Sequence, residues 1–553
     1  MRLQIVAVLG LFFAQTSSLP TATIEGVVVR IGTNQPIPDV RVMLTASSQT
    51  QPAGSVSVVT DSEGRFVMPG IDPGQYRIMF AAEGYSRMFY GQRVPTGIEE
   101  RGSSNFGTLV TLTAGQRLQG LGVALTPTGG ISGRVRSSSG VPAVNVPIQL
   151  LRATYSQDNQ RSFQPVGGTR SDDRGEYRLY WITPGRYYLA FGYTPGSSMQ
   201  ALFGNADMRG QFGLTYYPRA NDIGTALPID VGPAADLSGT DMVLEPLKLY
   251  RIRGRAIDQQ TGRAPASARA ALNFVSFSGF GGAGSNGSYD PASGVFELRD
   301  VAPGTYLAGI SVQDPSGGTA RPVPVTVVNS DVDGLVVTVM PMLSIPVNIS
   351  VEGRAFSSIP NLGRWGISLR EDVDNSLLSS RLAGTTGSIP STDGSSRFNN
   401  VLPGRFRLHV FAALPPGLYV KEAEYKGKDT LHEAFQISAS DPGSFSVILG
   451  TDPGQINGTI RNDSGLPVAG MRTVLVPDLH REQPDFYMTA NADGTGQFTF
   501  RDVAPGDYKL FAWEAIEPYA WYDPDVIKRY ETQGKAVHVS ESSNTTADLR
   551  LIP

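Results

Sequence analysis

Apolar and polar residues alternate with a period of two through most of the chain, in short runs separated by turn residues. Examples are residues 40–44 (VRVML) and 146–150 (VPIQL). Successive side chains of a strand point to opposite faces of a sheet, so this period predicts strands with one buried face. The pattern therefore predicts an all-β protein with few helices. The best helix candidate is the segment 524–533.

One motif recurs among these strands: Gly-x-aromatic, six residues, then Pro-Gly-x-aromatic. Its clearest copy contains Gly496, Phe498 and Tyr508. Five copies occur, with the glycine of Pro-Gly at Gly74, Gly185, Gly304, Gly404 and Gly506. These glycines are 111, 119, 100 and 102 residues apart, which indicates a tandem array. The copy that contains Phe398 is irregular, because four residues separate this aromatic from Pro-Gly and no glycine stands two residues before it.

Each part of the motif has a predicted role in a sheet. Proline presets φ for the first position of a turn and glycine accepts positive φ at the second, so Pro-Gly predicts a type II turn, with the five glycines as structural turn residues. We expect the strands on either side of it to be neighbours in one domain, with their aromatics in the core. Each repeat also opens with a strand that contains glycine, such as 24–27 (IEGV), except the fourth, which has 347–351 (VNISV).

The repeat length predicts five β-sandwich domains, each large enough to bury a core and fold alone. Their predicted bounds are 21–127, 128–247, 248–343, 344–450 (divergent) and 451–553. Only a few residues separate the last strand of one repeat from the first strand of the next. Because linkers this short are stiff, we expect an extended array.

The first residues are typical of a secretory signal peptide, predicted as 1–18. Met1 and Arg2 precede an apolar run of about a dozen residues, and cleavage is expected near Ser18. An uncleaved anchor is the alternative, but the run is shorter than the roughly 20 residues that a membrane-spanning helix needs. The mature chain is expected to contain no transmembrane span, and to be secreted, periplasmic or on the cell surface.

Composition narrows the range of partners. The 46 basic residues nearly balance the 50 acidic ones, which argues against a nucleic-acid-binding protein. The chain has no cysteine, so it forms no disulfides and carries no lipid on an N-terminal cysteine. Each domain must therefore be stable through its hydrophobic core.

Four motifs in a fixed order resemble the carboxypeptidase regulatory-like domain. They are Ile-x-Gly-x-Val, Gly-x-Pro followed by Val-x-Val, Thr-x-x-Asp-x-x-Gly-x-Phe, and Pro-Gly-x-Tyr, and they span about 80 residues of a repeat. The resemblance implies small β-sandwiches of the prealbumin (transthyretin-like) or immunoglobulin-like kind. It covers nearly the whole mature chain, with the fourth repeat matching poorly. Such domains occur in peptidases as accessory modules and also in surface stalks, so the resemblance assigns no activity.

The residues of a zinc carboxypeptidase site are missing. Such a site needs a His-x-x-Glu pair and a distant second histidine. The chain has four histidines, and only His538 stands three residues before a glutamate, Glu541, near the end of the chain. There is no Gly-x-Ser-x-Gly motif, and the acidic residues of the hairpin turns lack calcium-loop spacing. We therefore predict no enzyme activity, no catalytic residues, no metal and no cofactor.

Aromatic clusters outside the motif are the candidate ligand contacts. They are Phe89, Tyr90, Tyr216, Tyr217, Trp521 and Tyr522. Exposed aromatic rings stack on sugars or anchor partners, but rings at these positions would equally complete the sandwich core or fill a joint between domains. Trp513 is expected in the core, whereas Trp181 and Trp365 remain unassigned.

These observations predict a non-enzymatic secreted or cell-envelope protein that acts as a scaffold or adhesion-type binder. The alternative is a carbohydrate-binding protein that uses the aromatic clusters. The expected partner is accordingly a polysaccharide or another envelope protein.

Overall fold

The structure is a computed structural model of the chain. It describes residues 20–46, 56–92, 107, 109–155, 161–192, 212–221, 223–276, 279–283, 286–312, 319–359, 365–372, 386–411, 414–514, 516 and 519–553. The predicted signal peptide, 1–18, lies outside the described residues. By its internal contacts the chain divides into two compact units, repeat 1 and repeats 2–5.

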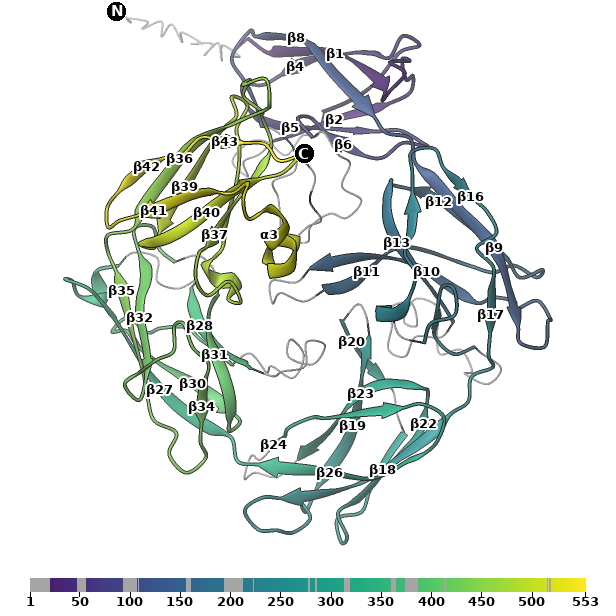
Figure 1. Cartoon of the computed structure of the whole chain (residues 1–553), viewed down its shortest axis with the longest axis vertical. Helices are drawn as coiled ribbons and strands as arrows, with labels where there is room; N and C mark the ends of the chain where they lie inside the picture. Colours follow the sequence, from purple (N-terminus) through teal and green to yellow (C-terminus); the bar gives the residue numbers. More distant parts are fainter. Residues whose placement is uncertain are drawn as a thin grey trace, which may run out of the picture. The chain divides into compact units, whose positions relative to one another are not determined.

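The all-β prediction is confirmed, and the strands follow the repeats (Figure 1). Repeat 1 contains β1 (Ala22–Arg30), β2 (Arg41–Ala46), β3 (Val56–Val59), β4 (Arg65–Ile71), β5 (Gly74–Ala81), β6 (Met88–Phe89), β7 (Val110–Leu112) and β8 (Arg117–Leu125). Repeat 2 contains β9 (Gly129–Ser137), β10 (Pro147–Tyr155), β11 (Arg161–Arg170), β12 (Glu176–Ile182), β13 (Gly185–Phe191), β14 (Thr215–Tyr216), η1 (Ile223–Thr225), β15 (Ile229–Val231), β16 (Asp236–Leu237) and β17 (Met242–Leu244).

The later repeats also consist mainly of strands. Repeat 3 contains β18 (Tyr250–Asp258), β19 (Ala268–Ser276), β20 (Gly279–Ala283), β21 (Asn286–Tyr289), β22 (Val295–Val301), β23 (Gly304–Val312), β24 (Thr319–Ala320), β25 (Val323–Val327) and β26 (Val332–Met340). Repeat 4 contains β27 (Leu343–Val351), η2 (Phe356–Ser358), β28 (Gly366–Glu371), β29 (Thr386–Ser388), β30 (Ser395–Val401), β31 (Gly404–Phe411), β32 (Tyr419–Tyr425), β33 (Lys428–Asp429), β34 (Phe435–Ile437) and β35 (Phe445–Gly450). Repeat 5 contains β36 (Gly454–Arg461), β37 (Arg472–Pro477), η4 (Pro484–Phe486), β38 (Met488–Asn491), β39 (Gln497–Val503), β40 (Gly506–Ala512), η5 (Ala520–Tyr522), α3 (Pro524–Tyr530), β41 (Lys535–Val539), β42 (Asn544–Thr546) and β43 (Leu549–Arg550).

Two sheets make up a repeat, and repeat 1 shows the plan (Figure 1). The opening strand β1 lies between β4, which is antiparallel to it, and β8, which is parallel. The second sheet places β2 between β3 and β5. Repeats 2, 4 and 5 also have two separate sheets, whereas in repeat 3 the strands join into one sheet of nine. Five buried apolar clusters each draw their fully buried residues from a single repeat.

A β-bulge precedes Pro-Gly in every repeat. Two residues of the strand before Pro-Gly lie opposite one residue of the opening strand, which shifts the register there. The second bulge residue stands three positions before the proline and has a φ between 54° and 74°. These five residues are Gly70, Trp181, Asp300, Asn400 and Asp502.

The Pro-Gly step is not a type II turn, so this prediction is wrong. The φ angles of Gly185, Gly304 and Gly506 are 158°, 152° and 159°, far from the roughly +80° that a type II turn requires, and Gly74 and Gly404 are not among the residues with positive φ. The flanking strands belong to one repeat, and in repeats 1, 2, 4 and 5 they lie in different sheets; in repeat 1, for example, β4 pairs with β1 and β5 pairs with β2. In these four repeats Pro-Gly therefore carries the chain from one sheet to the other, and in all five the bulge residue supplies the left-handed backbone conformation.

The glycine of the opening strand makes room for the first aromatic of the motif. A Cβ on Gly458 would lie 2.6 Å from the ring of Phe498 and 1.9 Å from the carbonyl oxygen of Ala547. The same pairing recurs in Gly26 with Phe66, Gly133 with Tyr177, and Gly254 with Phe296. The ring thus covers a position in the sheet that has no side chain.

This pairing also corrects the prediction for repeat 4. Val347 replaces the glycine and lies opposite Ser396, which occupies the aromatic position. Gly394, with a φ of 84°, stands two residues before Ser396. The fourth motif therefore has the leading glycine and the ordinary six-residue spacing. It differs at one cross-strand pair, where valine replaces the glycine of the opening strand and serine replaces the aromatic.

The aromatic after Pro-Gly bonds back across the Pro-Gly step. In four repeats it is a buried tyrosine whose hydroxyl donates a hydrogen bond to the carbonyl four residues earlier, at distances of 2.5 to 2.9 Å. Burial raises the pKa of one of these tyrosines, Tyr508, to about 12. Repeat 4 has Phe406 at this position and so lacks the bond.

Candidate functional site

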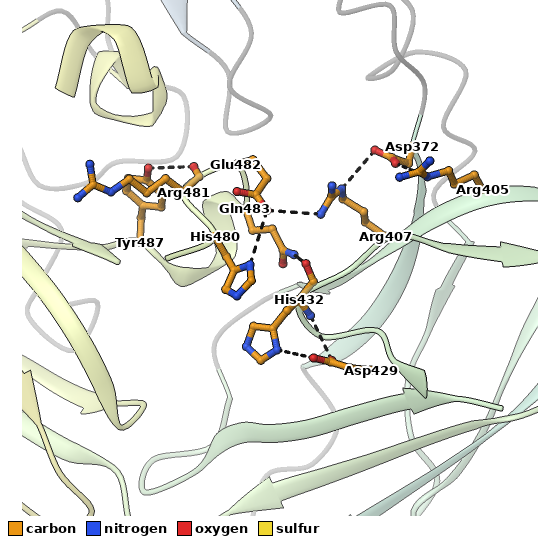
Figure 2. A network of polar contacts seen from close by, with 10 residues as sticks. All are labelled: Asp372, Arg405, Arg407, Asp429, His432, His480, Arg481, Glu482, Gln483 and Tyr487. Atoms are coloured by element: carbon orange, nitrogen blue, oxygen red, sulfur yellow. Dashed lines mark hydrogen bonds and ion pairs between the residues drawn. The ribbon is translucent and has the colours of Figure 1, made fainter. Parts of the chain in front are cut away.

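Three of the four histidines, His409, His432 and His480, gather with acidic and basic residues at the junction of repeats 4 and 5. Figure 2 shows two of them, His432 and His480. The Gln483 amide, from the segment between β37 and η4, donates a 2.6 Å hydrogen bond to the carbonyl oxygen of His432, which follows β33. The His432 ring lies 4.7 Å from the ring of His480, centroid to centroid. Its Nδ1 is 2.8 Å from a carboxylate oxygen of Asp429.

A second set of contacts centres on His409 of β31. Its Nδ1 donates to the carboxylate of Asp485, which also accepts a 3.1 Å hydrogen bond from the backbone nitrogen of Val410. Its Nε2 is 3.2 Å from the Arg370 guanidinium, which can only donate. Both ring nitrogens of His409 are therefore engaged, and Asp485 of repeat 5 is fixed against the edge of β31 in repeat 4.

Ion pairs extend this network along the junction (Figure 2). Asp372 lies 2.8 Å from Arg405 and 3.2 Å from Arg407, and Arg407 lies 3.8 Å from Glu482 of repeat 5. Within repeat 5, Arg481 pairs with Glu531 at 2.8 Å. The hydrogen bond from Arg481, together with that from Lys509, lowers the pKa of the Glu531 carboxyl to about 2.

Neighbouring contacts show that the bulge regions also take part in the joints. The carboxylate of Asp502, the bulge residue of repeat 5, accepts a 2.8 Å hydrogen bond from the backbone nitrogen of Gly417 in repeat 4. Arg321 of repeat 3 donates to the Pro403 carbonyl at 2.7 Å and pairs with Glu371 at 2.5 Å, both in repeat 4. Burial of Glu371 raises its pKa, which the Arg321 charge opposes.

Hydrogen bonds at this junction hold repeats 4 and 5 together. A general base needs a nitrogen or carboxylate oxygen that faces a substrate, with a nucleophile or a metal beside it. Both ring nitrogens of His409 have partners, and the Gln483 amide donates to a backbone carbonyl, so these two side chains are used in contacts of the junction. Across the described ranges no group of three or more histidine, acidic or cysteine side chains has a geometry that could hold a metal ion. No helix in that part of the chain is both long and apolar enough to cross a membrane.

The six predicted ligand-contact aromatics fall into two groups. Tyr216, Trp521 and Tyr522 are buried, so the exposure that direct ligand contact requires is not found for these three. Phe89, Tyr90 and Tyr217 are half-buried. Ligand contact by the six residues stays a prediction, but the core alternative describes the buried three better.

Trp521 and Tyr522 belong to a second apolar cluster in repeat 5, on the side of the sheet away from the main core. Trp513 joins this cluster, as expected of a core residue, together with Ile527 of helix α3. The helix predicted within 524–533 is confirmed as α3, which the Asp523 side chain caps by accepting from the Asp525 backbone nitrogen. The aromatics after β40 therefore attach this helix to the sheet.

Two structural features were not predicted from the sequence. The first is the bulge, although four of the five residues three positions before the proline are Gly, Asp or Asn, the types that best tolerate positive φ. The second is the place of Trp181. This residue is the fifth bulge residue, with a φ of 54° and an exposed fraction of 65%.

Comparison with protein families found a match for repeat 1. Residues 23–126 match the family model of the carboxypeptidase regulatory-like domain, which confirms the resemblance for repeat 1. A comparison with curated proteins found no match.

Several solved structures are similar to large parts of the chain. The Bacillus anthracis TIE protein matches at 9% identity and a TM-score of 0.16, covering 74% of this chain and 68% of that one. GBS52, the minor pilin of Streptococcus agalactiae, matches at 12% and 0.22, covering 41% and 97%. BcpA, the major pilin subunit of Bacillus cereus, matches at 10% and 0.15, covering 78% and 99%. At such identities and TM-scores, nothing about the activity or partners of this chain follows from them.

Proposed function

We propose that this chain is a non-enzymatic scaffold or adhesion-type protein of the cell envelope or extracellular space. It would consist of five β-sandwich domains with the bounds 21–127, 128–247, 248–343, 344–450 and 451–553. The observation that carries the proposal is the junction of repeats 4 and 5, where the His409 ring and the Gln483 amide each bond to the neighbouring repeat. A scaffold needs this arrangement, because it must hold successive domains in a fixed orientation.

The contacts at the junction support a fixed orientation. Asp485 accepts from both a ring and a backbone nitrogen of repeat 4, and Gln483 is buried while it donates to a repeat 4 carbonyl. A buried polar group that loses its partner costs about 1–3 kcal/mol, so rotation about the junction would leave several such groups unpaired. The junction should therefore have one preferred geometry.

Spin-label distances test this proposal. The chain has no cysteine, so Asn348→Cys in repeat 4 and Gln497→Cys in repeat 5, both exposed, provide two unique label sites. We expect one narrow distance distribution, and a broad one after Gln483→Ala and Asp485→Ala. The matched control is Asp463→Ala, because Asp463 is exposed and pairs with Arg550 inside repeat 5. A broad distribution in the parent chain would contradict a scaffold with a fixed joint.

Small-angle scattering of the chain without residues 1–18 tests the extended array. The predicted short linkers support an elongated particle. A compact, globular scattering profile would contradict it.

The second candidate function is carbohydrate binding by the predicted aromatic clusters. Partial exposure of Phe89, Tyr90 and Tyr217 favours it. Binding of polysaccharides on a glycan array should then weaken in Tyr90→Ala. An array without binding, or with binding unchanged in this variant, removes these clusters as the sugar site.

A further inference from the structure

Two consecutive residues on an edge strand of repeat 2 have exposed aromatic rings. Tyr180 and Trp181 form the bulge of β12, and each has an exposed fraction of 65%. The other three tryptophans, Trp365, Trp513 and Trp521, are buried. Trp181 is thus the exposed tryptophan of the chain, and it lies outside the aromatic clusters considered above.

The same position in the other four repeats provides an internal comparison. The bulge pairs there are Pro69-Gly70, Arg299-Asp300, Asn399-Asn400 and Arg501-Asp502. Glycine, aspartate and asparagine adopt positive φ readily, whereas a bulky residue in that region is strained. The fold therefore does not require an aromatic at this place, and Trp181 is held in a conformation that it disfavours without gaining burial in return.

The surroundings of the two rings are shaped to leave them accessible. The residue of β9 opposite the bulge is Gly130, whereas the other repeats have Thr23, Arg251, Ser344 or Gln455 there. No side chain of β9 therefore stands opposite the rings. The Arg178 guanidinium lies 5.2 Å from the centroid of the Tyr180 ring and pairs with Asp236 at 3.1 Å, which fixes the Tyr180 ring.

Size and charge indicate the class of ligand. At 65% exposure the two rings offer on the order of 300 Å², well below the roughly 800 Å² that each partner contributes to a stable protein interface. The basic residue beside the Tyr180 ring, Arg178, is paired with the carboxylate of Asp236. A ligand that fits has a flat apolar face for stacking and many hydroxyls for the polar rim, without net charge.

We propose that Tyr180 and Trp181 form a binding site for a neutral polysaccharide, with the pyranose face stacked on the Trp181 ring and the hydroxyls bonded to Arg178 and Asp236. This inference goes beyond the second candidate function, because it places sugar binding at a different site. Its test is independent of the Tyr90→Ala experiment, so either can fail alone.

Tryptophan quenching tests the proposal in the full chain. Acrylamide should quench Trp181 selectively, and the probes are cellohexaose, maltohexaose and xylohexaose. We expect at least one of them to protect Trp181 with saturable binding. Trp181→Asn, which copies Asn400 of repeat 4, should weaken binding at least tenfold, measured by calorimetry, while the melting temperature stays equal or rises. Tyr180→Thr should weaken binding several-fold.

Matched controls separate binding from folding. Leu479→Ala removes an exposed apolar side chain in repeat 5 and should leave binding unchanged. The proposal is overturned if none of the three oligosaccharides protects Trp181, if Trp181→Asn binds as the parent does, or if its melting temperature falls by several degrees. It is also overturned if hexagalacturonate binds better than the neutral probes, or if protection of Trp181 follows self-association in sedimentation experiments.

Discussion

The bulges of repeats 2 and 5 share one backbone conformation but carry different side chains. Their second residues, Trp181 and Asp502, have φ angles of 54° and 57°. Asp502 suits this conformation and accepts a hydrogen bond from Gly417 of the neighbouring repeat. Trp181 does not suit it and is exposed. The fold therefore fixes the backbone at this position but not the side chain. Asp502 contributes to the joint with repeat 4, whereas Trp181 is exposed at the surface of repeat 2.

Both repeats have a glycine in the opening strand that pairs with the bulged strand, and substitution of this glycine should have the largest effect. Gly458→Ala would put a Cβ 1.9 Å from the Ala547 carbonyl oxygen, a backbone atom that cannot move without separating β36 from the end of the chain. We expect a loss of roughly 3–5 kcal/mol in the stability of repeat 5, because overpacking and backbone displacement add. Urea unfolding followed by fluorescence of the buried Trp513 and Trp521 measures it.

Gly465→Ala is the control for this substitution. A Cβ at Gly465 meets nothing within 4 Å, although its φ is 76°. This change should cost only about 1 kcal/mol, which is the backbone term alone. Equal losses in the two variants would show that contact with Ala547 and Phe498 does not determine the glycine of the opening strand.

The joint side of the comparison depends on Asp502. Asp502→Ala removes the acceptor for the Gly417 nitrogen and places a residue at positive φ that tolerates it less well. The expected loss is about 2 kcal/mol, from one unpaired donor and the backbone cost. Asp502→Asn keeps both the acceptor oxygen and the tolerance of positive φ, so it should stay within about 0.5 kcal/mol of the parent. Thermal unfolding of the three chains decides, and a large loss in Asp502→Asn would point to the charge instead of the hydrogen bond.

The sequence predicted the fold better than the joints and the site. The period of two, the five Pro-Gly steps and the helix near Pro524 depend on local preferences, so they can be read along the chain. The irregularity of repeat 4 could not be interpreted from the sequence. Val347 and Ser396 replace the glycine and the aromatic at two paired positions, and only the strand register shows that these positions are paired. The histidine junction joins residues 51 and 76 positions apart, and no local pattern brings them together.

The burial of the candidate aromatics was equally beyond sequence reasoning. Trp181 precedes a Pro-Gly step and Trp521 follows one, and each has an aromatic neighbour in the sequence. Trp521 is buried because η5 and α3 fold back on the outer face of β37 and β40, whereas Trp181 lies on the bulge of edge strand β12. Exposure depends on this difference in tertiary cover, and residue type alone does not encode it.

The smallest effect concerns the tyrosine that closes the crossing beside the bulge. Tyr508→Phe removes the hydrogen bond from its hydroxyl to the Ala504 carbonyl, 2.9 Å long, and copies Phe406 of repeat 4. We expect a loss of about 1 kcal/mol, since the ring still fills the core.

Burial raises the pKa of Tyr508 in the folded state to about 12, above the 10 of an exposed tyrosine. The folded state therefore holds this proton more tightly, so the stabilisation is complete below pH 10 and is lost as the pH rises toward 12. Urea unfolding at pH 8 and at pH 11 should show the difference between parent and variant shrinking at the higher pH. A difference that is independent of pH would mean that the pKa of Tyr508 is the same in the folded and unfolded states, and no difference at either pH would mean that ring packing alone stabilises the crossing beside the bulge.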